Sequence, residues 1–203
     1  MDVDRPPSHT ASPLPKWAEL SFHRCPSCTL DPEVFQGCPA ALDLIEVVQE
    51  FSDRDSTEQI DVQVIASNRS YTHRCDVQMA LRSLIGLVMA SSACPYLSRL
   101  KGMARHHLPF SDRVETTRRT ASFYLLEQFF LYRDGHTPDL ALSGLRMIYD
   151  RLHEVNTCFA HRLRAAVSQD ASVNAIVSLS SLANLISFSL DDDLEELRRF
   201  LQQ

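Results

Sequence analysis

Hydrophobic and polar positions change their spacing near residue 75, and this change predicts two kinds of structure. Residues 60–65 alternate between apolar and polar, which is typical of a half-buried strand, and residues 69–73 follow a Ser-Asn turn signal as the return strand of a hairpin. Residues 17–22 alternate more weakly and predict a further strand. Residues 39–51 place their apolar side chains on one face of a short helix. After residue 75, every long segment has helical spacing.

Residues that start and stop helices mark the boundaries in this second part. Asp76 precedes an apolar periodic segment that ends in the small residues at 90–93. Asp112 and Glu115 have the spacing of a capping box for a helix that ends near Gly135. The other expected helices are a short one from Pro95 to about residue 105, a long one from near Pro138 to about residue 167, an apolar one over 172–188 and an amphipathic segment over 191–200.

These elements predict an α+β fold that is mostly α, in which a small N-terminal layer of β-hairpin and strand packs on a bundle of four to five helices. Residues 1–15, which are rich in proline and polar side chains, predict a disordered leader. Residues 16–203 predict a single globular domain. Its α/β layer (16–74) carries a cysteine cluster, and the rest (75–203) forms the bundle.

Charge and composition narrow the possible functions. The net charge of -6 argues against nucleic-acid binding, which usually needs a basic surface. Basic residues nevertheless concentrate between Arg99 and Arg119, which fits a solvated face or, alternatively, an anion pocket. The chain has no Gly-rich phosphate loop and no G-x-S-x-G motif, so nucleotide binding and serine hydrolysis are poorly supported.

Targeting signals and membrane spans are not evident in the sequence. The N-terminus lacks an apolar signal segment, and the apolar stretch at 84–90 is too short to cross a bilayer. We therefore expect a cytoplasmic protein with no membrane or nucleic-acid partner. A protein partner stays open, as does the choice between monomer and homodimer, because the apolar run at 129–132 fits a buried core or a dimer contact.

Six cysteines in a reducing compartment indicate metal binding, redox chemistry or simple burial before disulfides. Cys25 and Cys28 form a C-x2-C pair, and Cys38 follows at an expected helix start. Two sulfurs on one turn, with a third able to close over the same point, suit tetrahedral zinc. Cys75 and Cys158 are expected to be buried packing residues.

A tetrahedral site needs a fourth ligand. The candidates for it are Cys94 and His107, with His23 as a local alternative. Cys94 precedes a helix, whose N-terminus favours a thiolate, and a short helix can return His107 to it. Zinc is the expected ion, and a four-sulfur set suits an iron–sulfur cluster equally well. A redox dithiol and plain burial remain the alternatives. The candidate metal ligands are Cys25, Cys28, Cys38, Cys94 and His107.

A thiol-dependent enzyme is the second hypothesis. In it Cys94 is the nucleophile and His107 the base, while Arg118 or Arg119 holds an anionic substrate. The sequence does not decide whether the protein is an enzyme. The leading hypothesis is a metal-binding accessory or interaction protein, with zinc or, alternatively, an iron–sulfur cluster.

Three strings in the chain resemble a bacterial family of domains of unknown function, whose pattern reads F-x-x-C-P-x-C-P-L, G-L-x-M-A-x-S-G-C-P and M-A-R-x-H-L-P-F. The likeness extends over nearly the whole chain after residue 16 and implies no activity. The matching strings are Phe22-His-Arg-Cys25-Pro-Ser-Cys28, Leu87-Val-Met-Ala-Ser-Ser-Ala-Cys94-Pro95 and Met103-Ala-Arg-His-His-Leu-Pro-Phe110.

The resemblance carries some candidate residues over and departs from the family pattern at others. This chain has Thr29 where the pattern has proline, and Ala93 where it has glycine. Cys38 lies outside the three strings and rests on its spacing alone. The positions that the resemblance carries over are Cys25, Cys28, Cys94 and His107.

Overall fold

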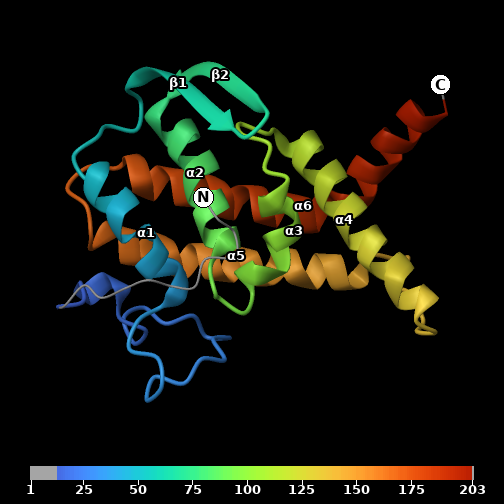
Figure 1. The fold of residues 1–203 in the computed structure, drawn as a ribbon, viewed down its shortest axis with the longest axis horizontal. Helices are drawn as coiled ribbons and strands as arrows, with labels where there is room; N and C mark the ends of the chain where they lie inside the picture. Colours follow the sequence, from blue (N-terminus) through green and yellow to red (C-terminus); the bar gives the residue numbers. More distant parts are fainter. Residues whose placement is uncertain (1–12, 203) are drawn as a thin grey trace.

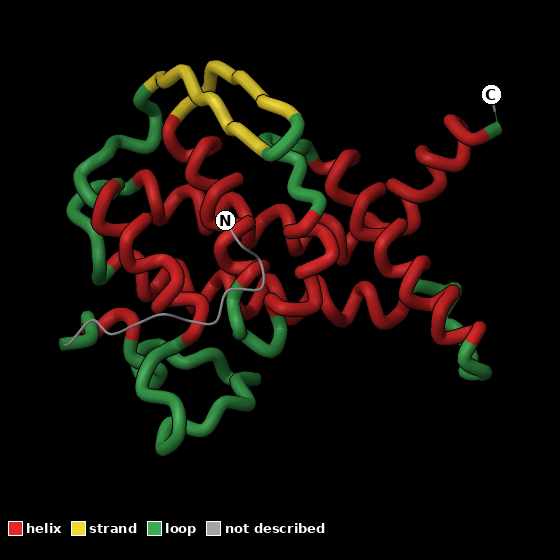
Figure 2. The backbone as a smooth tube through the Cα atoms, in the orientation of Figure 1, coloured by secondary structure: helices red, strands yellow, loops and turns green. Residues whose placement is uncertain are grey.

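A computed structural model describes residues 13–202, which form six α-helices, two 3-10 helices and one two-stranded antiparallel sheet (Figures 1 and 2). The predicted α+β fold, mostly α, is confirmed. The leader predicted for residues 1–15 lies outside the described residues, apart from 13–15. In chain order the elements are η1 (Lys16–Ala18), α1 (Pro39–Glu50), β1 (Gln59–Ala66), β2 (Arg69–Asp76), α2 (Val77–Ser91), η2 (Leu97–Leu100), α3 (Lys101–Arg105), α4 (Arg113–Arg133), α5 (Ser143–Arg164) and α6 (Ala171–Leu201).

The hairpin forms as predicted and leads directly into α2. β1 and β2 pair in register from Gln59 opposite Asp76 to Ala66 opposite Arg69, and residues 67–68 make the turn. Asp76 ends the hairpin and also begins α2, because its side chain accepts a hydrogen bond from the Met79 N–H at 2.9 Å. This cap satisfies a helix N–H that has no partner within the helix.

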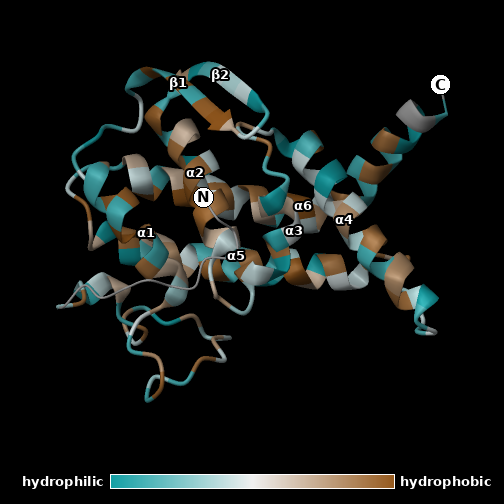
Figure 3. Ribbon diagram, in the orientation of Figure 1, coloured by the Kyte–Doolittle hydropathy of each residue, from teal (hydrophilic) through white to brown (hydrophobic). Residues whose placement is uncertain are grey.

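The bundle is built around α5 and α6, which lie side by side along most of their length (Figure 1). Both α2 and α4 pack on α6, and α1 packs on α2. Apolar residues concentrate where α2 and α6 meet (Figure 3), and burial of these side chains supplies the main driving force for folding. Fully buried side chains of this core include Leu81, Ile85, Leu145, Leu163, Ile176 and Ile186.

A single helix, α6, covers the two helical segments predicted over 172–188 and 191–200. Its backbone leaves helical geometry at Ser189, with φ -105° and ψ 18°, which is where the two patterns meet. Beyond the kink, buried Asp193 pairs with Arg113 and accepts a hydrogen bond from Thr117 at 3.1 Å. These contacts hold the last part of α6 against the start of α4.

The segment Ala171–Arg199 of α6 is long and apolar enough to cross a membrane by length and composition. Core helices of soluble proteins pass the same test, and α6 packs here against α5, α2 and α4. This helix is therefore weak evidence for a membrane span.

One predicted strand and the predicted start of one helix are wrong. Residues 17–22 form no strand: Lys16–Ala18 is a 3-10 helix, and Glu19 makes an isolated bridge with Gly37. The cause is that Trp17 and Ala18 are both buried, whereas a strand sends neighbouring side chains to opposite faces. The long helix begins at Ser143 rather than near Pro138, because Leu142 has the left-handed backbone conformation, with φ 57°.

The apolar run at 129–132 does not lie in the core. Phe129, Phe130 and Tyr132 are 52%, 51% and 65% exposed, on the C-terminal half of α4. This half of α4 extends away from the rest of the bundle (Figure 1), which leaves these side chains exposed.

Candidate functional site

The cysteine loop (residues 19–38) connects η1 to α1 and is attached to two distant parts of the chain. The Ser27 N–H and hydroxyl donate to Glu154 of α5 at 2.9 and 2.5 Å, and the Tyr96 hydroxyl donates to the Ser27 carbonyl at 2.6 Å. The Cys28 N–H donates to the Cys25 carbonyl at 3.0 Å and closes the turn between the two thiols. The C-x2-C pair therefore lies against α5 and the connection between α2 and η2.

Cys38 lies at the N-terminus of α1, where the sequence predicted a helix start. Burial raises the pKa of the Cys38 thiol, while the positive charge of Arg162 and the N–H groups of Ala41 and Ala40 act in the opposite direction. The Arg162 charge and the two N–H groups therefore favour the thiolate form of Cys38. Without a bound metal, burial outweighs them and the pKa of the thiol is raised.

Cys94 follows the end of α2 and precedes η2. The N–H groups of Leu97 and Tyr96 lower the pKa of its thiol, as expected at a helix start, but burial raises that pKa more strongly. The net shift is upward. The lowered pKa that we expected for a free Cys94 nucleophile is therefore wrong, because desolvation outweighs the helix N–H groups.

Five thiols lie near one another in this region. Burial raises the pKa of Cys25, and the neighbouring thiols of Cys158, Cys38 and Cys94 raise it further. Cys28 in turn contributes to the raised pKa of Cys94. Tertiary structure thus places each of four predicted ligands within electrostatic range of another cysteine. It also adds Cys158 of α5, which the sequence suggested was only a packing residue.

A buried cation lies beside this thiol cluster (Cys25, Cys28, Cys38, Cys94 and Cys158). Arg162 of α5 is 1% exposed, and its positive charge lowers the pKa of both Cys38 and Cys158. Within the described residues its hydrogen bonds go to carbonyl oxygens and no carboxylate pairs with it, while its Nε–H is buried without an acceptor. The accepting carbonyls belong to Trp17, Glu19 and Leu20, at 2.7–3.1 Å.

The described candidate ligands are not already arranged around a common point where a metal ion could bind. Between residues 13 and 202, no three or more His, Cys, Asp or Glu side chains are grouped as they would be around one metal ion. The other local candidate, His23, has a left-handed backbone (φ 43°) and stacks on exposed His161, with ring centroids 5.4 Å apart. Metal binding would therefore require the cysteine side chains to rotate and the cysteine loop to tighten.

His107 belongs to a different site. Its Nε2 lies 3.1 Å from the Ser83 hydroxyl of α2. Burial, followed by the positive charge of Arg119, lowers the pKa of His107 to about 4. The structure gives no contact between His107 and Cys94, so it does not assemble the nucleophile–base pair of the second hypothesis.

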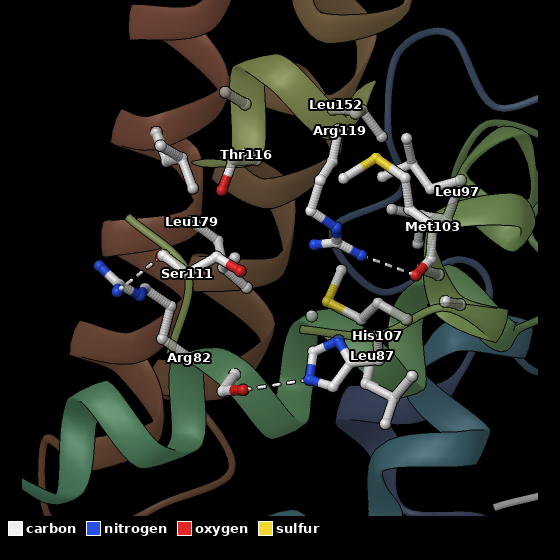
Figure 4. A pocket seen from close by; sticks show the side chains of 18 of the residues that line it. Arg82, Leu87, Leu97, Met103, His107, Ser111, Thr116, Arg119, Leu152 and Leu179 are labelled. Atoms are coloured by element: carbon white, nitrogen blue, oxygen red, sulfur yellow. Dashed lines mark hydrogen bonds between the residues drawn. The ribbon is translucent and has the colours of Figure 1, made fainter. Parts of the chain in front are cut away.

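His107 and Arg119 line a cavity of about 150 Å³ between α2, α3, α4, α5 and α6 (Figure 4). The Arg119 guanidinium donates to the carbonyls of Met103 and His106 at 3.1 and 2.7 Å. Most of the remaining wall is apolar. Neither the cavity nor the role of Arg162 was visible in sequence spacing, because each combines residues from helices far apart in the chain.

Comparison with known proteins gives a family but no function. The chain has no match among curated proteins, and it has none among solved structures. A family model described as a domain of unknown function, DUF6901, matches residues 3–202. With nearly its whole length matched, and with an α+β architecture of bundle and hairpin, the chain belongs to the DUF6901 family.

Proposed function

We propose that this protein binds one zinc ion through Cys25, Cys28, Cys38 and Cys94, and that the bound ion attaches the cysteine loop to the helical bundle. The protein would then act as an accessory or interaction module. Zinc sites of four cysteines are typically structural, with all coordination positions filled by the protein.

The observation that carries this proposal is the buried Arg162 cation beside the thiols. Four thiolates around Zn²⁺ leave a net charge of about -2 on the centre. Burying that charge is costly unless a cation lies nearby. Arg162 supplies such a cation, and among the described residues it has no carboxylate that already neutralises it.

The backbone around two of the ligands supports the same proposal. The N–H groups of Ala40 and Ala41 act to lower the pKa of the Cys38 thiol, and those of Tyr96 and Leu97 act to lower the pKa of the Cys94 thiol, against the larger effect of burial. Donors directed at coordinating sulfurs stabilise the thiolate form and orient the ligand. The raised thiol pKa values belong to protonated cysteines without a metal, and coordination would remove those protons.

Metal analysis of the purified full-length protein is the direct test. We expect about one zinc per chain, or iron with visible absorption if the centre is an iron–sulfur cluster. Cobalt substitution should give the intense visible bands of a tetrahedral thiolate site. Protein that contains neither metal, and that takes up no zinc or cobalt under reducing conditions, would contradict the proposal.

Two cysteine variants separate coordination from packing. Cys28→Ser should lose most of the bound zinc, because a hydroxyl is a much poorer ligand than a thiolate. Cys75→Ser is the control, because it makes the same substitution at a buried cysteine whose charged neighbours are Asp76 and Arg82 rather than other thiols. If both variants retain the wild-type zinc content, Cys28 is not a ligand.

The interaction role is supported by the exposed apolar side chains of α4. Apolar patches on a surface often mark a protein contact, and Phe129 and Phe130 are each about half exposed. Sedimentation velocity over a range of concentrations tests whether the partner is a second copy. Self-association that is abolished in the Phe129→Ser/Phe130→Ser double variant would support that; a monomer at every concentration would exclude it.

The chemistry of the cysteines also indicates the cellular compartment in which the protein works. All six cysteines are free in the structure, and thiolate zinc sites require reduced sulfur. We therefore infer that the protein works in a reducing compartment, the cytoplasm, as its composition suggested.

A further inference from the structure

The second site, the cavity around Arg119, is separate from the thiol cluster. Its walls come from five α-helices and from η2, and Figure 4 shows the side chains of Arg119 and His107 entering it from α4 and from the segment after α3. A cavity of about 150 Å³ equals in size an engineered apolar cavity that accommodates benzene. The space therefore suits a small ring or a short branched chain.

The charged side chains that line the cavity, among the described residues, are positive. Arg82 and Arg119 both line it, and none of the lining residues that the structure describes is Asp or Glu. Within residues 13–202, Arg119 donates only to backbone carbonyls, and Arg82 makes long hydrogen bonds to the Ser178 hydroxyl and the Ser111 carbonyl, at 3.4 and 3.5 Å. Several surface arginines are instead paired with carboxylates: Arg54, Arg99, Arg113, Arg146, Arg151 and Arg198.

Arg119 is half-buried and retains unused hydrogen-bonding capacity. Both of its described hydrogen bonds use Nη2, so Nε–H and the Nη1 donors remain. Burial lowers the pKa of this guanidinium, and Tyr149, Glu115 and Tyr71 act against that shift without forming an ion pair with it. A half-buried cation with free donors and no bound carboxylate is well suited to hold an anion from solution.

The remaining surface of the cavity is apolar and would hold the rest of a ligand. Leucine and methionine side chains from several helices face the space, and the neutral imidazole of His107 lies beside Arg119, held by Ser83. Because His107 is uncharged at neutral pH, it can lie next to an apolar group or accept a hydrogen bond. The apolar lining residues include Leu87, Met89, Leu97, Met103, Leu152 and Leu179.

We propose that this cavity binds a small monocarboxylate with an apolar body, the carboxylate on Arg119 and the body against the leucine and methionine side chains. This inference does not depend on the zinc site, because the residues that carry it are not part of the thiol cluster.

Benzoate is a suitable probe because its ring matches the cavity size and its charge matches Arg119. Titration of the full-length protein, followed by calorimetry or by methyl chemical shifts, should give a dissociation constant below about 1 mM for a ligand of this size. Benzamide, which keeps the shape and loses the charge, should bind about tenfold more weakly or worse.

Two neighbouring arginines provide a matched pair of variants. Arg119→Gln should weaken benzoate binding by about tenfold or more, because it removes the charged donors. Arg118→Gln, at an exposed position on the same helix, should leave it unchanged. Absence of benzoate binding to wild type, equal affinity for benzamide, or unchanged affinity in Arg119→Gln would each overturn the proposal.

A third variant keeps the test decisive if Arg119→Gln does not fold. Gly86 lines the cavity within α2, and a Cβ added there would lie 3.4 Å from Leu179 Cδ2, which is ordinary van der Waals contact. Gly86→Ala should therefore fold, reduce the cavity by about a methyl group and weaken benzoate binding at least about threefold. Wild-type affinity in this variant would place benzoate outside the cavity and contradict the inference.

Discussion

Arg162 and Arg119 are wholly or partly shielded from solvent, and neither pairs with a carboxylate among the described residues. Arg162 is fully buried and Arg119 half-buried, and each donates to backbone carbonyl oxygens within the described residues. Carbonyl dipoles partly compensate the loss of hydration, but they leave the positive charge intact. Each arginine thus creates a site where a negative charge is favourable: thiolates near Arg162 and a carboxylate near Arg119.

Replacing Arg162 with Met should destabilise the protein strongly. The substitution removes the Arg162 donor from the Trp17 and Leu20 carbonyls, while the Glu19 carbonyl keeps the Phe22 N–H. Unsatisfied buried groups cost about 1–3 kcal/mol each. We expect the free energy of unfolding in urea to fall by about 2–4 kcal/mol for Arg162→Met. The exposed Arg164→Met variant should change it by less than about 0.5 kcal/mol; equal effects would mean that the buried hydrogen bonds contribute little.

His107 should make stability depend on pH in the acidic range. Its pKa in the folded protein is about 4, below the ordinary value of 6.5. Between these values the unfolded chain binds a proton that the folded protein excludes, so stability falls as pH decreases from 6.5 to 4. This loss amounts to about 3 kcal/mol at most.

Urea unfolding at several pH values measures this contribution. The His107→Gln variant can keep a hydrogen bond to Ser83 but cannot titrate, so its stability should change less between pH 6.5 and 4. The exposed His136→Gln variant should follow wild type. Identical pH profiles for wild type and His107→Gln would show that His107 is protonated freely in the folded state.

Helix caps explain why several elements begin where they do. Asp112 and Glu115 form the complete capping box predicted at the start of α4: the Glu115 N–H donates to the Asp112 side chain at 2.8 Å, and the Asp112 N–H donates to Glu115 at 3.1 Å. Asp76 caps α2 through a single bond of this kind, which its side chain accepts from the Met79 N–H. These contacts are local, so their effect follows from a few neighbouring residues.

Removing the α4 cap should have a moderate effect on stability. Asp112→Ala loses the acceptor for the Glu115 N–H, and we expect the free energy of unfolding to decrease by about 1 kcal/mol. Asp112→Ser keeps a capping oxygen and should recover most of this loss. Thermal or urea unfolding of the two variants measures the difference, and equal destabilisation by Ala and Ser would exclude capping as the cause.

The molecule as a whole combines an apolar bundle with an N-terminal segment that is held by both apolar burial and polar contacts. The bundle helices bury leucine and isoleucine side chains against one another. The cysteine loop buries Leu20 in the same core and is also attached by polar contacts with Arg162, Glu154 and Tyr96. A zinc ion would add the strongest link between these two parts, which is why its loss should affect the loop before the bundle.

Limited trypsin digestion with and without a zinc chelator should reveal this difference. Arg24 lies in the cysteine loop, where its guanidinium donates to the carbonyls of Cys28 and Leu30. Chelation should accelerate cleavage after Arg24 by about tenfold, because local opening exposes it. Cleavage after Arg69, the first residue of β2 beside the hairpin turn, serves as the internal control. An equal rate after Arg24 with and without chelator would contradict a zinc-held loop.

Local features determined what could be predicted from the sequence by itself. Alternation over 60–65, the caps at Asp76 and Asp112, and helical spacing after residue 75 act over a few neighbouring residues, and the structure has the corresponding elements. The predicted strand at 17–22 failed because burial of Trp17 and Ala18 against the rest of the molecule outweighed a weak alternating pattern.

Only the tertiary structure decided which chemical groups meet. The sequence suggested that His107 returns to Cys94, but packing places it with Ser83 and Arg119 in a cavity. Conversely, α5 brings Arg162 and Cys158 to thiols more than a hundred residues earlier in the chain. The physical reason is that helix packing is directed by the burial of apolar faces, so the polar groups that come together depend on how whole helices cross and not on their spacing in sequence.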